Sequence, residues 1–139
     1  MTTKPPAIER VMLIDDEMVD QMIYKRVIHR SQLVRDIVTF GYAEDALAYL
    51  RDPASPPVDL ILLDINMPRM NGFEFLDAYG ADPGPGASAV VITMLTTSLT
   101  ASDRARAEKS ELVREFFNKP LTGEHVATAA ALVREAKAE

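Results

Sequence analysis

The 139-residue chain is 47% hydrophobic and contains no cysteine, which allows one domain with a substantial core and excludes a disulfide framework, a thiolate nucleophile and a cysteine metal site. The formal net charge of −6 and the lack of a basic stripe argue against a nucleic-acid partner. No apolar stretch approaches the roughly 18 residues of a membrane span, and the N-terminus has no apolar signal-peptide core. We therefore expect a soluble cytoplasmic protein without a membrane partner.

Short apolar runs alternate with segments whose apolar residues recur at helical spacing, after a leader at residues 1–8 that we expect to be flexible. The runs predict strands and the periodic segments predict helices, in the order strand 11–14, helix 19–31, strand 37–40, helix 43–51, strand 59–64, helix 71–79, strand 89–95, helix 101–109, strand 112–117 and helix 124–137. A Gly- and Pro-rich loop is expected at 80–88. This alternation predicts one α/β domain at 9–137, a doubly wound fold with a five-stranded parallel sheet, right-handed crossovers and helices on both faces.

The first predicted helix has an apolar stripe formed by Val19, Met22, Ile23 and Val27. Residues at this spacing share one face of a helix, so we expect the stripe to face the core. Methionines such as Met22 are then interpreted as core filler.

Charged and hydroxyl residues follow the ends of four predicted strands. Asp15 and Asp16 follow the first strand, Asp64 ends the third, Thr96 follows the fourth and Lys119 follows the fifth. In open parallel sheets, ligands gather in the crevice beyond the carboxyl ends of the strands. These side chains therefore predict a functional site at that edge.

Crowding of Asp15, Asp16 and Asp64 would require a proton or a cation, because two carboxylates about 4 Å apart repel by roughly 4 kcal/mol at an effective dielectric constant near 20. Oxygen ligands without histidine or cysteine favour a hard ion, and we expect Mg²⁺, with Mn²⁺ as an alternative. A divalent cation and the Lys119 ammonium facing a carboxylate would suit a phosphoryl group.

Simpler interpretations exist for each residue taken alone. An aspartate at a strand end is often only the N-cap of the next helix. Phe116 and its neighbour Phe117 suit a core, and Thr96 has other hydroxyl residues nearby. These are Thr93, Thr97, Ser98 and Thr100.

Four motifs carry a family resemblance: Ile14-Asp15-Asp16-Glu17, Leu62-Leu63-Asp64-Ile65-Asn66-Met67-Pro68-Arg69-Met70-Asn71-Gly72, Leu95-Thr96-Thr97 and Phe116-Phe117-Asn118-Lys119-Pro120. Together they resemble the receiver domain of two-component response regulators, of the stand-alone type related to the chemotaxis regulator, over about residues 8–136. The resemblance implies a flavodoxin-like (βα)5 fold.

The resemblance also implies roles for individual residues. Asp64 would be the phospho-acceptor, and Mg²⁺ would be bound by Asp16, Asp64 and the backbone carbonyl of Asn66, with Asp15 acting mostly through water. Thr96 and Lys119 would engage the phosphoryl group.

Phe116 would be the aromatic residue that changes rotamer, together with Thr96 as the switch. The output face would lie on the fourth helix, fifth strand and fifth helix. A cis Lys119–Pro120 bond is expected, because the resemblance requires a bend that brings the lysine over the site.

The leading hypothesis is a phosphorylation switch rather than an enzyme, with at most self-catalysed phosphorylation and dephosphorylation. Its donor would be a histidine kinase or a histidine phosphotransfer protein, and its output would be binding to another protein. An alternative is a Mg²⁺-dependent aspartyl-phosphate phosphohydrolase. That class resembles a pattern with a second acid two residues after the nucleophile, where this chain has Asn66. A phosphate sink is the third possibility.

Overall fold

Five parallel strands form one sheet in the order β2-β1-β3-β4-β5, in a computed structural model that describes residues 6–85, 90–97 and 100–138. The strands are β1 (Ile8–Ile14), β2 (Val34–Phe40), β3 (Leu60–Asp64), β4 (Val91–Thr96) and β5 (Val113–Asn118). The strand order reverses at β1, whose neighbours are β2 and β3. The predicted doubly wound sheet is thus confirmed, and the crevice that binds ligands in such sheets lies beyond the ends of β1 and β3.

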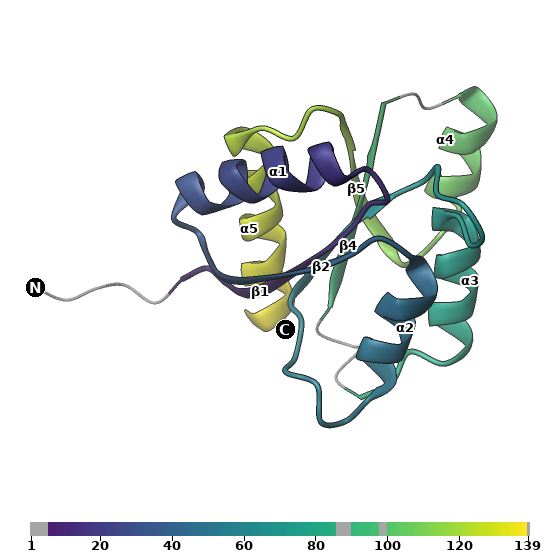
Figure 1. Cartoon of the computed structure of the whole chain (residues 1–139), viewed down its shortest axis with the longest axis horizontal. Helices are drawn as coiled ribbons and strands as arrows, with labels where there is room; N and C mark the ends of the chain where they lie inside the picture. The colour runs from purple at the N-terminus through teal and green to yellow at the C-terminus, as the bar shows by residue number, and fades with distance from the viewer. Residues whose placement is uncertain (1–5, 86–89, 98–99, 139) are drawn as a thin grey trace, which may run out of the picture.

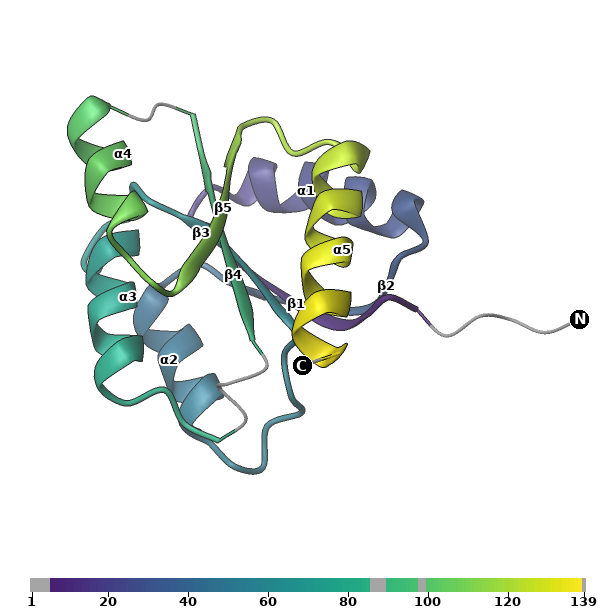
Figure 2. The same ribbon diagram turned by 180° about the vertical axis from the view of Figure 1, so that it is seen from behind.

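Helices cover both faces of the sheet (Figure 1, Figure 2). Helices α1 (Met18–Ser31) and α5 (Gly123–Ala138) lie on one face, and α2 (Ala43–Arg51), α3 (Gly72–Ala81) and α4 (Ala101–Glu108) lie on the other. Among the described residues, no helix combines the length and apolar character needed to cross a membrane.

The three central strands are buried on both sides, and this divides the core in two. Alternate residues of each strand point to opposite faces of a sheet. The core beneath α2, α3 and α4 includes Met12, Ile14, Ile61, Leu63, Ile92 and Met94. The core beneath α1 and α5 includes Val11, Leu13, Leu60, Leu62, Val91 and Leu95. Burial on both faces explains why these strands appear in the sequence as continuous apolar runs.

Strands β1 and β2 begin three residues earlier than predicted. Ile8 pairs with Val34 and is fully buried, but charged residues interrupt the apolar pattern in this part of both strands. Those charges pair with each other: Arg10 Nε lies 2.7 Å from Asp36 Oδ2, and an equal distance separates Arg35 Nε from Glu9 Oε1. Residues 1–5 of the predicted leader, 86–88 of the predicted loop and residue 89, where the fourth strand was predicted to begin, lie outside the described residues.

The predicted orientation of α1 is wrong for most of its stripe. Tyr24 and Ile28 are the buried residues of this helix, whereas Val19, Met22 and Ile23 are 66%, 57% and 46% exposed. The helix carries apolar residues on two faces, and periodicity alone does not say which face meets the sheet. Met22 is therefore a surface residue and not core filler.

Candidate functional site

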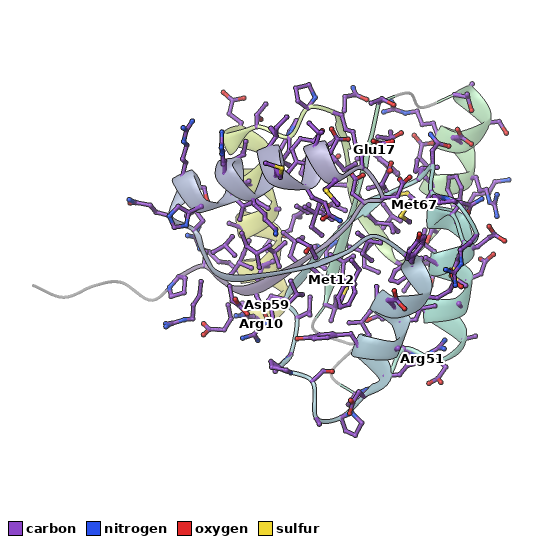
Figure 3. The ribbon with its side chains drawn as sticks, viewed as in Figure 1. Arg10, Met12, Glu17, Arg51, Asp59 and Met67 are labelled. Carbon is purple, nitrogen blue, oxygen red and sulfur yellow. The ribbon has the colours of Figure 1, made fainter. Side chains whose placement is uncertain are left out.

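The polar residues predicted at the strand ends converge beyond the carboxyl edge of the sheet. Asp64 is the last residue of β3 and pairs in register with Leu95 of β4. The backbone N–H of Asp15 donates to Phe40 at 3.0 Å, and that of Lys119 donates to the carbonyl of Thr96 at 2.8 Å. These backbone hydrogen bonds thus fix the positions from which the side chains of Asp15 and Lys119 extend. Figure 3 labels Glu17 and Met67 in the loops at this edge, and Arg10 and Asp59 at the opposite edge.

Three carboxylates form the acidic part of the site. Ligand oxygens of Asp15, Asp16 and Asp64 lie within 4.8 Å of one another, which confirms the predicted crowding. Asp15 and Asp64 are buried, and Asp16 is the most accessible of the three. Oδ1 of Asp15 accepts a hydrogen bond from the backbone N–H of Glu17 at 2.9 Å, so half of this carboxylate is already occupied.

Lys119 provides a fixed positive charge among these acids. Its Nζ donates to Asp15 Oδ2 at 2.8 Å and to Asp20 Oδ2 at 2.9 Å, and lies 3.8 Å from Asp64 Oδ2. Burial alone would lower the pKa of Lys119, but the hydrogen bonds to Asp15 and Asp20 raise it above its usual value. The lysine therefore stays charged at any physiological pH. The Lys119–Pro120 peptide bond is cis, as predicted.

Asp20 is the site residue that sequence reasoning missed. It lies in the first turn of α1, whereas the pattern that predicts the site consists of residues at strand ends. The available signal is its position five residues after Asp15, in the first turn of a helix that starts at the site. Asp20 brings the number of carboxylates near Lys119 to three, with Asp15 and Asp64.

The carboxyl of Asp64 has a raised pKa. The pKa is raised from 3.8 to about 6 by the balance of several causes. Burial is the largest and raises it, Lys119 and the backbone N–H of Asn66 lower it, and the charge of Asp15 raises it. A buried carboxylate among like charges is stabilised by a nearby cation. The acceptor candidate is thus mostly ionised at pH 7 but electrostatically strained.

The loop after β3 closes tightly over Asp64. A Cβ on Gly72 would lie 2.7 Å from the backbone oxygen of Asp64 and 2.9 Å from the Cα of Ile65, so only glycine fits without a shift. The N–H of Gly72 donates to Ile65 at 2.8 Å. Asn71 and Glu74 then start α3 with a reciprocal capping box.

The donor set fits a divalent cation. It consists of carboxylate oxygens, with no histidine or cysteine among them, and such ligands suit a hard ion such as Mg²⁺. Burial and neighbouring negative charge raise the pKa of Asp64, which means that they disfavour its ionised form. A bound cation would stabilise that form. Asn66 is exposed and lies two residues after Asp64, so its backbone carbonyl belongs to the loop that follows β3.

Among the described hydroxyl residues, Thr96 is the one at the end of β4. It is buried and pairs in register with Asn118. Thr93 lies inside the sheet, where its hydroxyl donates to Ile61 at 3.4 Å, and Thr100 caps α4. Thr97 is exposed, and Ser98 lies outside the described residues.

The two phenylalanines of β5 face opposite cores. Phe116 pairs with Met94, is half-buried and packs against the core beneath α2, α3 and α4. Phe117 is buried against the other core and stacks on His125, with ring centroids 4.5 Å apart. Phe116 is therefore on the α4 side of the sheet, and its rotamer change stays a prediction.

Comparison with known proteins agrees with this fold and site. Residues 11–131 match the family model described as the response regulator receiver domain. A crystal structure of a two-component response regulator from Cytophaga hutchinsonii superposes with a TM-score of 0.85 at 28% identity, covering 92% of this chain and 98% of that one. The chain belongs to the response regulator receiver domain family, and it is a receiver domain of two-component signalling.

Curated relatives differ in what surrounds the shared domain. Response regulator Rcp1 from Synechocystis is 27% identical over 105 residues, which are 73% of this chain and 69% of that protein. A protein-glutamate methylesterase/protein-glutamine glutaminase from Hahella chejuensis is 34% identical over 134 residues, which are 93% of this chain but 34% of the relative. The match thus spans about a third of that enzyme.

Proposed function

We propose that Asp64 accepts a phosphoryl group from a phosphohistidine of a histidine kinase or histidine phosphotransfer protein, and that the chain signals as a cytoplasmic switch by binding another protein. The observation that carries this proposal is the buried Asp64 carboxylate, which lies 3.8 Å from the Lys119 ammonium and within 4.8 Å of two further aspartates. We assign this receiver function to residues 9–137.

The transfer forms one bond and breaks one. A carboxylate oxygen of Asp64 attacks phosphorus, the O–P bond forms as the donor N–P bond breaks, and the electron pair passes to the imidazole nitrogen, which then takes a proton. The carboxyl pKa of about 6 leaves Asp64 mostly ionised at neutral pH, as a nucleophile requires. The Lys119 ammonium stabilises charge on the phosphoryl oxygens.

Mg²⁺, or Mn²⁺, would be held by Asp16, Asp64 and the backbone carbonyl of Asn66, with Asp15 acting through water. When bound, the ion would offset the negative charge of the carboxylates as an anionic donor approaches. The chain's own residues do the rest: Asp15 holds Lys119 at 2.8 Å, and the loop at Gly72 fixes the backbone of Asp64.

The exposed stripe of α1 supports a protein donor. Met18, Val19, Met22 and Ile23 are exposed on the helix that begins beside the site. Contiguous patches of exposed apolar side chains mark interaction surfaces, whereas single exposed apolar side chains are common and need no explanation. A donor protein that covers this stripe would bring its phosphohistidine to Asp64.

The phosphohydrolase alternative has weaker support. An exposed amide, Asn66, stands two residues after Asp64, where that class would need an acid to protonate the leaving group. A phosphate sink would use the same chemistry as the switch and would differ only in having no output partner.

The test of the acceptor is phosphorylation by acetyl phosphate in the presence of Mg²⁺, followed by intact-mass measurement and peptide mapping. We expect one phosphoryl group on the wild type, none on Asp64→Asn and none after chelation of the metal. Asp45→Asn is the matched control, because Asp45 is an exposed aspartate in the first turn of α2. Undiminished labelling of Asp64→Asn would contradict the assignment.

A further inference from the structure

The resting position of Lys119 is held by two carboxylates that are not the acceptor. Nζ bonds to Asp15 at 2.8 Å and to Asp20 at 2.9 Å, whereas Asp64 at 3.8 Å is beyond hydrogen-bond length. The lysine side chain is 6% exposed, so few water molecules can replace these partners. Lys119 is therefore already paired with Asp15 and Asp20 before any phosphoryl group binds.

Asp20 differs from Asp15 in how firmly it is built into the site. Asp15 is fully buried and also accepts the N–H of Glu17. The Asp20 side chain is 29% exposed, and its Oδ2 accepts a hydrogen bond from Lys119 Nζ. Asp15 thus holds the backbone at Glu17 as well as the lysine. The hydrogen bond that Asp20 accepts comes from the lysine.

The charges around Lys119 are unbalanced. One ammonium lies within 3.8 Å of carboxylate oxygens from Asp15, Asp20 and Asp64. A phosphoryl group adds about −1.5 to −2 charge. The phosphoryl group must therefore compete with Asp20 for the positive charge of Lys119. It is also repelled by the negative charge of Asp20.

We propose that Asp20 is a positioning residue that competes with the phosphoryl group for Lys119 and so limits how tightly the site holds that group. The proposal rests on the proposed function of Asp64. It assigns Asp20 no contact with the phosphoryl group itself. The effect passes through Lys119, whose ammonium is drawn toward α1 in the unphosphorylated protein.

Beryllofluoride binding followed by ¹⁹F NMR tests this competition, with beryllofluoride as the phosphoryl mimic and Mg²⁺ saturating for each variant. We expect Asp20→Asn to bind the probe roughly fivefold more tightly than wild type, which is the scale of a partly exposed ion pair. Asp20→Glu keeps the charge and should bind like wild type. Asp45→Asn, which removes a negative charge from the first turn of α2, should also leave the affinity unchanged.

A second measurement needs neither metal nor probe. The ¹⁵N resonance of the Lys119 ammonium should shift in metal-free Asp20→Asn and stay unchanged in Asp45→Asn. An unchanged resonance in Asp20→Asn would show that the two side chains are not paired in solution and would overturn the proposal.

The outcomes separate the two claims. A wild-type chain that binds no beryllofluoride contradicts the proposed function and this inference with it. Wild-type binding that Asp20→Asn leaves unchanged or weakens overturns the inference alone. Equal effects of Asp20→Asn and Asp20→Glu would also overturn it, because the charge would not be the cause.

Discussion

Asp64 is ionised at neutral pH at a cost to the folded state. Its pKa is raised from 3.8 to about 6, chiefly by burial, so the folded protein binds this proton more tightly than the unfolded chain does. The resulting contribution to stability is fully present below about pH 4 and is lost as the pH rises through about 6. At pH 8 the ionised carboxyl therefore lowers the free energy of unfolding.

Replacing Asp64 by asparagine should stabilise the metal-free protein at pH 8 and have little effect at pH 4. Each pKa unit corresponds to about 1.4 kcal/mol, so the gain at pH 8 should be roughly 1 to 3 kcal/mol. Urea denaturation at both pH values measures it, with Asp45→Asn as the control. Equal stability of Asp64→Asn and wild type at pH 8 would show that the carboxyl is not strained.

For single residues, the sequence was sufficient to predict that Asp15, Asp16, Asp64 and Lys119 lie close together. Each ends or follows a predicted strand, and the carboxyl ends of parallel strands lie at one edge of the sheet. It was insufficient for Asp20, because a side chain in the first turn of α1 reaches the site only through the angle at which that helix leaves β1. The five-residue spacing from Asp15 places Asp20 in the first turn of that helix but does not encode this angle.

Among the elements, α1 departs most from its predicted packing. The three central strands were found from continuous apolar runs, which require burial on both faces, whereas the edge strands β2 and β5 are only partly buried. Helix α1 has Tyr24 and Ile28 on its buried face and Val19, Met22 and Ile23 on the exposed side. With apolar residues on both sides, the amphipathic pattern is ambiguous, and only the packed sheet selects the face. The unselected face is available for a partner.

The double variant Met22→Gln and Ile23→Gln should reduce phosphorylation by a histidine kinase that is active on the wild type, roughly tenfold if these side chains behave as interface hot spots. Labelling by acetyl phosphate should be unchanged, because the small donor needs no protein surface. Phosphotransfer rates with both donors measure the difference.

Leu112→Gln is the control for the α1 variant, because Leu112 is a large exposed apolar residue near the start of β5, at the opposite edge of the sheet. Equal loss with kinase and acetyl phosphate would place the defect in the site and not in docking.

In the whole molecule, the sheet separates two cores, and a structural change caused by phosphorylation could reach either of them. Phe116 lies on the side of α4, and Phe117 on the side of α5. Thr96 ends β4, the strand beside them, and its carbonyl bonds to Lys119. A movement of Thr96 toward a phosphoryl group would reach Phe116 through the pairing of β4 with β5. The sequence predicted helices on both faces of the sheet but not which phenylalanine packs on which face, because that depends on the register of β5.

Beryllofluoride should change amide exchange and NMR shifts around Phe116 and α4 in the wild type, and Thr96→Ala should reduce that response while retaining the complex. A shift from a mostly inactive to a mostly active state requires several kcal/mol of differential binding. Contacts of Lys119 and Thr96 with the phosphoryl group would supply charge-assisted hydrogen bonds for it. An undiminished response in Thr96→Ala would exclude Thr96 as the coupling residue.

Tyr24 gives the site an optical property of its own. The chain has no tryptophan, so tyrosines dominate its near-ultraviolet emission. The Tyr24 ring is buried and lies 5.8 Å from Nζ of Lys119, and burial raises the pKa of its phenol above the usual value. A cation that moves relative to an aromatic face changes the electric field at that ring. We therefore expect displacement of Lys119 to change the contribution of Tyr24 to the intrinsic fluorescence of the four tyrosines.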